Sequence, residues 1–270
     1  MELPEIDSLL RLTELTRANL PGLTERIQGF SEQPSDTEPR HYEGYRQWPL
    51  PRFRPRWWPS LDRVLQSRRW RPDLAERPLR MRELGRLLQL AHGVCATGGR
   101  GPTPSAGGLN ALELYLVHWG EPVAEESAGR SAGGPRQPGP PPCPLGQRDP
   151  VPSGVFHYDR AKHALAELAR GAVRARWQDL IPSWGLLSGG RVLWIVVGDV
   201  ARVQAKYGVR AERFLLLEAG HLMQNLSLVS TSLGLVTIPL GGFLEQEISE
   251  ELRLLGRDRV LFCGVCGGVP

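Results

Sequence analysis

Lysine is nearly absent from this chain, which carries 31 arginines but only two lysines, Lys162 and Lys206. A lysine amine can lose its proton inside a protein, whereas a guanidinium stays charged. Lys206 also stands directly before Tyr207, so an amine and a phenol are neighbours in the sequence. The pair is a candidate acid-base site. A solvated lysine at a helix end beside a half-buried tyrosine explains the same residues without a function.

Cysteine is also scarce, with four residues in a chain of 270. That number does not make a disulfide framework in a chain of this size, and a zinc site needs four ligands. Cys263 and Cys266 form a single Cys-x-x-Cys motif without a second pair of ligands at suitable spacing. We predict no metal site, and we expect the two cysteines to be small apolar residues on a final strand.

Long hydrophobic runs are missing too. The most apolar segment, residues 214–235, is interrupted by polar side chains, so nothing approaches the roughly 20 residues that a membrane span needs. Acidic residues follow Met1 where a signal peptide would be basic. The net charge of +4 is spread along the chain and favours neither a nucleic-acid nor a membrane partner. We therefore expect a globular, cytoplasmic protein.

Residues 1–56 are predicted to be a helix followed by an extended arm. Apolar residues recur at helical spacing between Ile6 and Leu15, and the periodicity is lost from residue 28 onward. Arginines alternate with aromatic residues in residues 52–58, a composition that can stack on single-stranded nucleic acid. A proline-stiffened arm that packs its tryptophans against the rest of the chain explains this segment without a ligand.

Residues 57–270 are predicted to form one domain of α+β class, in which helices and strands alternate. Residues 120–154 are rich in Pro, Gly and Ser, and we expect them to be a disordered insertion between two strands. The other expected elements are a helix capped by Ser60, a helix through residues 84–90, strands at 112–117, 155–158 and 192–197, a helical patch with Leu165 and Leu168, and a long buried helix from Phe214 to Leu233 that closes at Gly234.

Four stretches recur with the order and spacing of a known family. They are Pro104-Ser105-Ala106-Gly107-Gly108-Leu109 before the strand at 112–117; Gly154-Val155-Phe156-His157-Tyr158-Asp159; Lys206-Tyr207-Gly208 with Arg213 and Leu217-Glu218-Ala219-Gly220-His221; and Ile238-Pro239-Leu240-Gly241-Gly242-Phe243. Together they resemble the nitroreductase-like flavoproteins, in particular the SagB-type dehydrogenases, which oxidise azolines in ribosomally made peptides. The resemblance covers roughly residues 40–120 and 154–268.

This resemblance implies a nitroreductase-like fold, with a central mixed or antiparallel sheet flanked by helices and a long buried helix, in an intertwined homodimer that holds FMN at its interface. It also implies arginine forks on the flavin phosphate and glycine-rich loops against the flat ring. The residues expected to bind FMN on this basis are Arg68, Arg69, Arg71, Pro104, Ser105, Ala106, Gly107, Gly108, Arg213, Pro239, Leu240, Gly241 and Gly242. For Arg213, a salt bridge to Glu212 or Glu218 is an equal alternative.

The resemblance further implies that Lys206 abstracts a ring proton of the substrate while hydride passes to the flavin, and that Tyr207 assists or positions. The same resemblance implies a peptide substrate or a partner in a modification complex. His221 is expected to be a hydrogen-bonded imidazole of the core, with Glu218, one helical turn away, as its structural partner.

Several residues depart from the family pattern. Trp70 and Pro72 interrupt the arginine motif of the phosphate site, Gly268 stands where a basic residue is common, and Asn110 and Glu212 replace aromatic residues. Three functions therefore stay open. The first is an FMN-dependent oxidoreductase that acts on an azoline-like ring or another small substrate, and the second is a degenerate relative that keeps the dimer as a binding or regulatory subunit. A nucleic-acid-binding module built on the arginine and tryptophan arm is a third.

Overall fold

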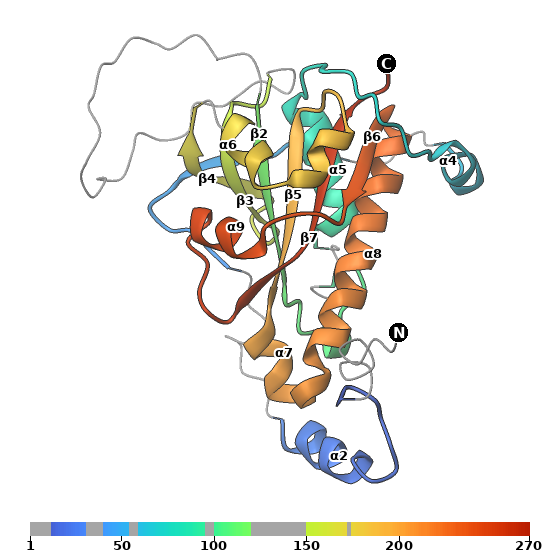
Figure 1. Cartoon of the computed structure of the whole chain (residues 1–270), viewed down its shortest axis with the longest axis vertical. Coiled ribbons are helices and arrows are strands. Elements are labelled where there is room, and N and C mark those ends of the chain that lie inside the picture. Colours follow the sequence, from blue (N-terminus) through green and yellow to red (C-terminus); the bar gives the residue numbers. More distant parts are fainter. Residues whose placement is uncertain (1–11, 31–39, 54–58, 95–99, 120–149, 172–173) are drawn as a thin grey trace.

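The computed structural model describes residues 12–30, 40–53, 59–94, 100–119, 150–171 and 174–270 (Figure 1). These residues form the predicted α+β fold, in which a seven-stranded sheet has helices on both faces. The strand order is β1-β4-β3-β2-β5-β7-β6, and every neighbouring pair is antiparallel. The strands are β1 (Arg46–Pro49), β2 (Leu112–His118), β3 (Gly154–Asp159), β4 (Ala164–Arg170), β5 (Val192–Asp199), β6 (Leu235–Leu240) and β7 (Asp258–Gly268).

The helices of the described residues differ widely in length. The 22-residue α8 (Ala211–Ser232) runs along one face of the sheet (Figure 1). The other helices are α2 (Leu20–Gly29), α4 (Leu61–Ser67), α5 (Met81–His92), α6 (Arg174–Asp179), α7 (Val200–Tyr207) and α9 (Glu245–Glu251), together with the short 3-10 segments η1 (Ala106–Gly108), η2 (Pro182–Leu186) and η3 (Gly208–Arg210).

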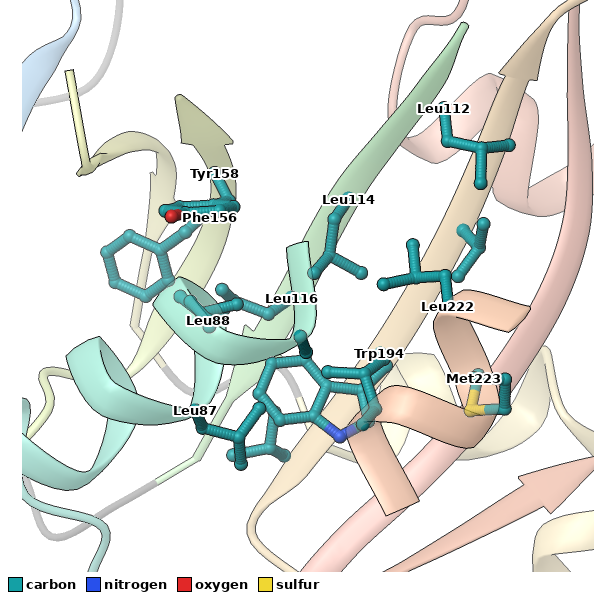
Figure 2. Packing of buried hydrophobic residues seen from close by; sticks show 14 of the residues in the cluster. Leu87, Leu88, Leu112, Leu114, Leu116, Phe156, Tyr158, Trp194, Leu222 and Met223 are labelled. Atoms are coloured by element: carbon teal, nitrogen blue, oxygen red, sulfur yellow. The ribbon is translucent and has the colours of Figure 1, made fainter. Parts of the chain in front are cut away.

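Side chains that alternate along β2 enter two separate cores, because successive residues of a strand point to opposite faces. Tyr115 and Val117 pack with Trp177 of α6 and Trp184 of η2. On the other face, Leu112, Leu114 and Leu116 belong to a cluster that includes Leu87, Leu88, Leu222 and Met223 (Figure 2). The sheet is thus buried between α5 and α8 on one side and shorter helices on the other.

Most of the predicted elements are confirmed. The strands at 112–117, 155–158 and 192–197 are β2, β3 and β5, and the three expected helices are α4, α5 and α8. Ser60 caps α4, because its hydroxyl accepts a hydrogen bond from the N–H of Arg63 at 3.3 Å. The chain leaves α8 through Gly234, whose φ of 68° suits glycine. Cys263 and Cys266 are buried on β7.

The helical patch predicted at Leu165 and Leu168 is wrong, because both residues lie in β4. The segment Ala-Leu-Ala-Glu-Leu-Ala-Arg consists of good helix formers. β4 is nevertheless paired with β1 on one side and with β3 on the other. Four successive residues at its start are buried, so the alternation that marks a half-exposed strand is missing from the sequence.

The N-terminal part differs from the prediction as well. Residues 1–11 lie outside the described residues; Leu12 is helical, but residues 13–19 are not, so the helix does not continue through Leu15. α2 follows and was not predicted. Within the expected arm, β1 forms the edge of the sheet, and the indole N–H of Trp48 donates to Glu167 Oε2 at 2.7 Å.

Two segments with predicted properties fall outside the described residues: most of the insertion, at 120–149, and the arginine and tryptophan residues at 54–58. The insertion is flanked by β2 and β3, as predicted. Phe53 packs on α5, where its ring lies 4.0 Å from the guanidinium carbon of Arg86 and its N–H donates to Gln89 at 2.7 Å. Within the part of the chain that the structure describes, the helices are too short or too polar to cross a membrane.

Candidate active site

Lys206 and Tyr207 end helix α7 and reach the loop that contains Gly107. The Asp199 side chain caps this helix at its start by accepting the N–H of Arg202 at 3.1 Å. A Cβ atom built on Gly107 would lie 2.5 Å from the Tyr207 hydroxyl and 2.8 Å from Lys206 Nζ. The structure therefore brings together two of the predicted groups of site residues, the lysine–tyrosine pair and the Pro-Ser-Ala-Gly-Gly loop.

The loop at residues 104–110 is held by hydrogen bonds within itself. The N–H of Gly108 donates to the Ser105 carbonyl at 3.1 Å, and the N–H of Asn110 donates to Ser105 Oγ at 2.8 Å. Gly107, Gly108 and Asn110 all have positive φ, at 61°, 75° and 51°. Asparagine tolerates this left-handed conformation better than most side chains. Asn110, which departs from the family pattern, therefore suits the loop that it closes.

Glu218 of α8 is buried against this loop. Its carboxylate accepts the N–H of Ala106 at 2.5 Å and also forms a hydrogen bond with Ser105. Burial raises the pKa of Glu218, although these hydrogen bonds and the charge of Arg160 act in the opposite direction. The expected pairing of Glu218 with His221 is therefore wrong.

His221 itself is exposed, which corrects the prediction of a core imidazole. It lies with Gly220 and Gln224 on an exposed face of α8, which the described residues leave uncovered. The face that Glu218 occupies is turned toward the loop and the sheet. Sequence spacing defines which residues share a helix face, but not which face the neighbouring elements cover.

The surroundings of the lysine–tyrosine pair are aromatic and half-buried. Lys206 Nζ lies 5.2 Å from the ring centre of Phe30, the residue that follows α2. The ring of Tyr207 packs edge-on against Phe214 at 4.9 Å. Burial, and secondarily the charge of Glu218, raises the pKa of the Tyr207 phenol. Tyr207 is therefore protonated at neutral pH and can donate a hydrogen bond.

Arg202, on the same helix, directs its side chain to Asn110 and Asp199. Its guanidinium donates to the Asn110 carbonyl at 3.2 Å and lies 3.8 Å from the Asp199 carboxylate.

Arg213, predicted to contact either the flavin or a carboxylate, donates to Thr13 Oγ1 at 2.7 and 3.0 Å. Arg210 donates to the Thr13 carbonyl at 2.6 Å. The N-terminal segment is thereby attached next to the start of α8.

A second group of predicted site residues lies elsewhere. Arg68, Arg69 and Arg71 follow α4 and are exposed, as is Trp70 at 59%. α4 and α7 lie toward opposite ends of the long axis of the molecule (Figure 1). One copy of the chain therefore does not bring the arginine run and Lys206 together.

The Pro-Leu-Gly-Gly segment at the end of β6 is connected to the arginine run through η2. The carbonyl of Gly242 accepts hydrogen bonds from the Ser183 hydroxyl at 2.8 Å and from the Ser183 N–H at 3.3 Å. Just after η2, the N–H of Ser188 donates to the Pro72 carbonyl at 2.9 Å. Pro239 and Gly241 are exposed, whereas the Leu240 side chain belongs to the core. Ser183 was not predicted, since an isolated serine carries no signal in the sequence.

Gly268, the third departure at the phosphate site, has a structural explanation. Its N–H and carbonyl pair with the backbone of Ala75 at 2.8 and 3.0 Å. A Cβ atom at this position would lie 3.1 Å from Cγ of Arg77, whose guanidinium pairs with Glu83 at 2.8 Å. A basic side chain at 268 would have to displace Arg77.

Comparison with known proteins identifies this architecture. A protein of Ralstonia eutropha JMP134 that is named as a nitroreductase superimposes with a TM-score of 0.64 at 19% identity, over 87% of this chain and 94% of that chain. A chain of the E. coli microcin synthetase McbBCD complex, solved with truncated pro-MccB17 bound, superimposes with a TM-score of 0.56 at 20% identity, over 97% of this chain and 86% of that chain. The seven-stranded antiparallel sheet with flanking helices is thus the nitroreductase-like α+β fold.

The sequence gives the same family. Residues 66–268 match the nitroreductase family. A Methanocaldococcus jannaschii protein named as a nitroreductase is 29% identical over 204 residues, which cover 72% of this chain and 85% of that protein. The chain belongs to the nitroreductase family, whose proteins are oxidoreductases that typically bind FMN.

Proposed function

We propose that the chain is an FMN-dependent dehydrogenase of the SagB type, acting on an azoline-like ring. The observation that carries this proposal is the contact of Lys206 and Tyr207 with Gly107, which joins a proton-accepting amine to a loop that a flat cofactor can approach. FMN, when bound, supplies the hydride acceptor. Lys206 takes a proton from the substrate ring, and Tyr207 holds the substrate through its protonated hydroxyl.

The residues that are present fit FMN. Arg68, Arg69 and Arg71 offer exposed guanidinium groups for a phosphate, which arginine binds in a bidentate manner. A Cβ atom built on Gly108 or Gly241 would have no neighbour within 4 Å, so a planar ring can approach the backbone there. Both features support the assignment of FMN to these loops.

A homodimer would complete this site. The loop with Gly107 and the segment with Gly241 belong to the two separate groups, so a second copy must supply one of them. α8 offers a surface for that copy, because Leu216 and Leu217 are 50% and 56% exposed on the face that also carries Gly220 and Gln224. Exposed leucines on one helix face are typical of an interface.

The substrate class rests on the Lys-Tyr-Gly motif and on the fold shared with a chain of the McbBCD synthetase complex. Both favour a peptide substrate and a partner in a modification complex.

The alternative, a binding or regulatory subunit without flavin, is favoured by Trp70, Pro72 and Gly268, which reduce the contacts available to a phosphate.

Replacement of Lys206 tests the proposed chemistry. In Lys206→Ala, reduction of bound flavin by a thiazoline-containing peptide should slow by about 100-fold or more, because general-base catalysis contributes on this order. The absorbance spectrum of the bound flavin should stay unchanged. Anaerobic stopped-flow absorbance measures both.

Lys162→Ala is the matched control. Lys162 is the other lysine of the chain, and its amine lies 3.7 Å from Asp159. Its loss should leave the rate unchanged. Normal turnover in Lys206→Ala would remove this residue from the mechanism.

A further inference from the structure

Glu218 is a buried carboxyl for which the roles of Lys206 and Tyr207 give no reason. Only 5% of its surface is exposed. It accepts the N–H of Ala106 at 2.5 Å and bonds to Ser105, the two residues that precede Gly107. The carboxyl therefore faces the loop rather than a cation of its own helix.

This placement costs stability at neutral pH. Burial raises the pKa of Glu218, so ionising this acid costs more in the folded chain than in the unfolded chain. Its contribution to stability is fully present below the pKa of the unfolded chain, and it is lost as the pH rises through the folded value. A neutral side chain of the same shape would therefore serve the fold equally well or better. A buried carboxyl with a shifted pKa beside a candidate site is typical of functional residues.

The hydrogen bonds of Glu218 continue toward the lysine–tyrosine pair. Ser105, which bonds to Glu218, accepts the N–H of Asn110 at 2.8 Å, so Asn110 at the end of the loop is linked to the carboxyl through Ser105. Gly107, between these ends, is the residue that the Tyr207 hydroxyl and the Lys206 amine contact. A shift of the loop would move the surface against which both side chains rest.

We propose that Glu218 is a positioning residue, whose carboxylate fixes Ala106 and Ser105 so that Gly107 and Gly108 present a flat surface to the flavin and hold Lys206 and Tyr207 in place. This inference rests on the proposed function. It gives a reason for a buried acid that neither the fold nor the proton transfer requires.

Hydrogen exchange tests the contact in the protein without flavin. In Glu218→Gln, the Ala106 amide should exchange about tenfold faster, because a neutral acceptor replaces a charge-assisted one. The melting temperature should stay the same or rise. Glu212→Gln, which removes an exposed carboxyl of the same helix, should change neither quantity. If Glu218→Gln does not fold, Ser105→Ala tests the same contact from the loop, with faster exchange at Ala106 as the expected result.

FMN titration and turnover test the consequence. Glu218→Gln should bind FMN about tenfold more weakly and show a lower kcat at unchanged KM for the thiazoline peptide, whereas Glu212→Gln should match the wild-type chain. Unchanged exchange at Ala106, wild-type kcat, or a melting temperature that falls in parallel with kcat would overturn the role of Glu218. Failure of the wild-type chain to bind FMN would instead overturn the proposed function, and the two failures are distinguishable because exchange is measured without flavin.

Discussion

At the scale of single residues, Gly107 lies in close contact with the lysine–tyrosine pair. Its φ of 61° already favours glycine, and the space beside its Cα is taken by Lys206 and Tyr207. Gly108 shares the positive φ, at 75°, but a Cβ atom there would meet nothing within 4 Å. Alanine substitutions at Gly107 and Gly108 therefore separate the effect of backbone strain from the effect of contact with Lys206 and Tyr207.

Gly107→Ala and Gly108→Ala should therefore lose similar stability, about 1 kcal/mol each, since both place a Cβ atom at positive φ. The atoms that Gly107→Ala meets are the ends of flexible side chains, which can move away. At saturating FMN, turnover should accordingly fall by about tenfold or more in Gly107→Ala, because small displacements of reacting groups are costly. Gly108→Ala should instead weaken FMN binding, since its Cβ atom would stand on the surface offered to the flavin. Urea unfolding and stopped-flow kinetics measure the two effects, and equal turnover in both variants would refute the contact.

The sequence predicted that Lys206, Tyr207 and the loop around Gly107 belong to one site, because family motifs link residues that are distant in the chain. It did not predict the role of Glu218. A carboxyl and a histidine one turn apart suggest a pair within the helix. Which of them is buried depends on the rotation of α8 against the sheet, and that is set by tertiary packing.

At the scale of elements, the strands with continuous apolar sequence were predictable, whereas β4 was not. β2 and β5 contain runs of large apolar residues that favour buried strands. β4 consists of helix formers and becomes a strand only because β1 and β3 pair with it. The N-terminal arm was partly mispredicted for the same reason, since β1 depends on β4.

The packing of the arm on α5 has a direct test at Gly85. A Cβ atom on Gly85 would lie 2.7 Å from the carbonyl oxygen of Pro51, a backbone atom that cannot rotate away. Gly85→Ala should lower the free energy of unfolding by about 1–3 kcal/mol despite the better helix propensity of alanine. Urea denaturation measures the change.

Arg82→Ala is the control on the same helix, because Arg82 is exposed. Its effect should stay within about 0.5 kcal/mol. Stabilisation by Gly85→Ala would show that the arm does not pack closely on α5.

At the scale of the whole molecule, the predicted flavin residues fall into two groups that one chain keeps apart. Lys206, Tyr207 and Gly107 lie at the start of α8, and the arginine run follows α4, toward the other end of the long axis (Figure 1). α8 is about 33 Å long at 1.5 Å per residue. The proposed FMN site therefore needs residues from two copies of the chain. The sequence of one copy contains both groups of residues but does not show how they are arranged.

The central claim is that two copies of this chain bind FMN between them. The most direct measurement is a titration of the purified chain with FMN, followed by visible absorbance and by the mass from light scattering. We predict saturation at about one FMN per chain, in a particle with the mass of two chains. A dimer that stays colourless in excess FMN would contradict the claim.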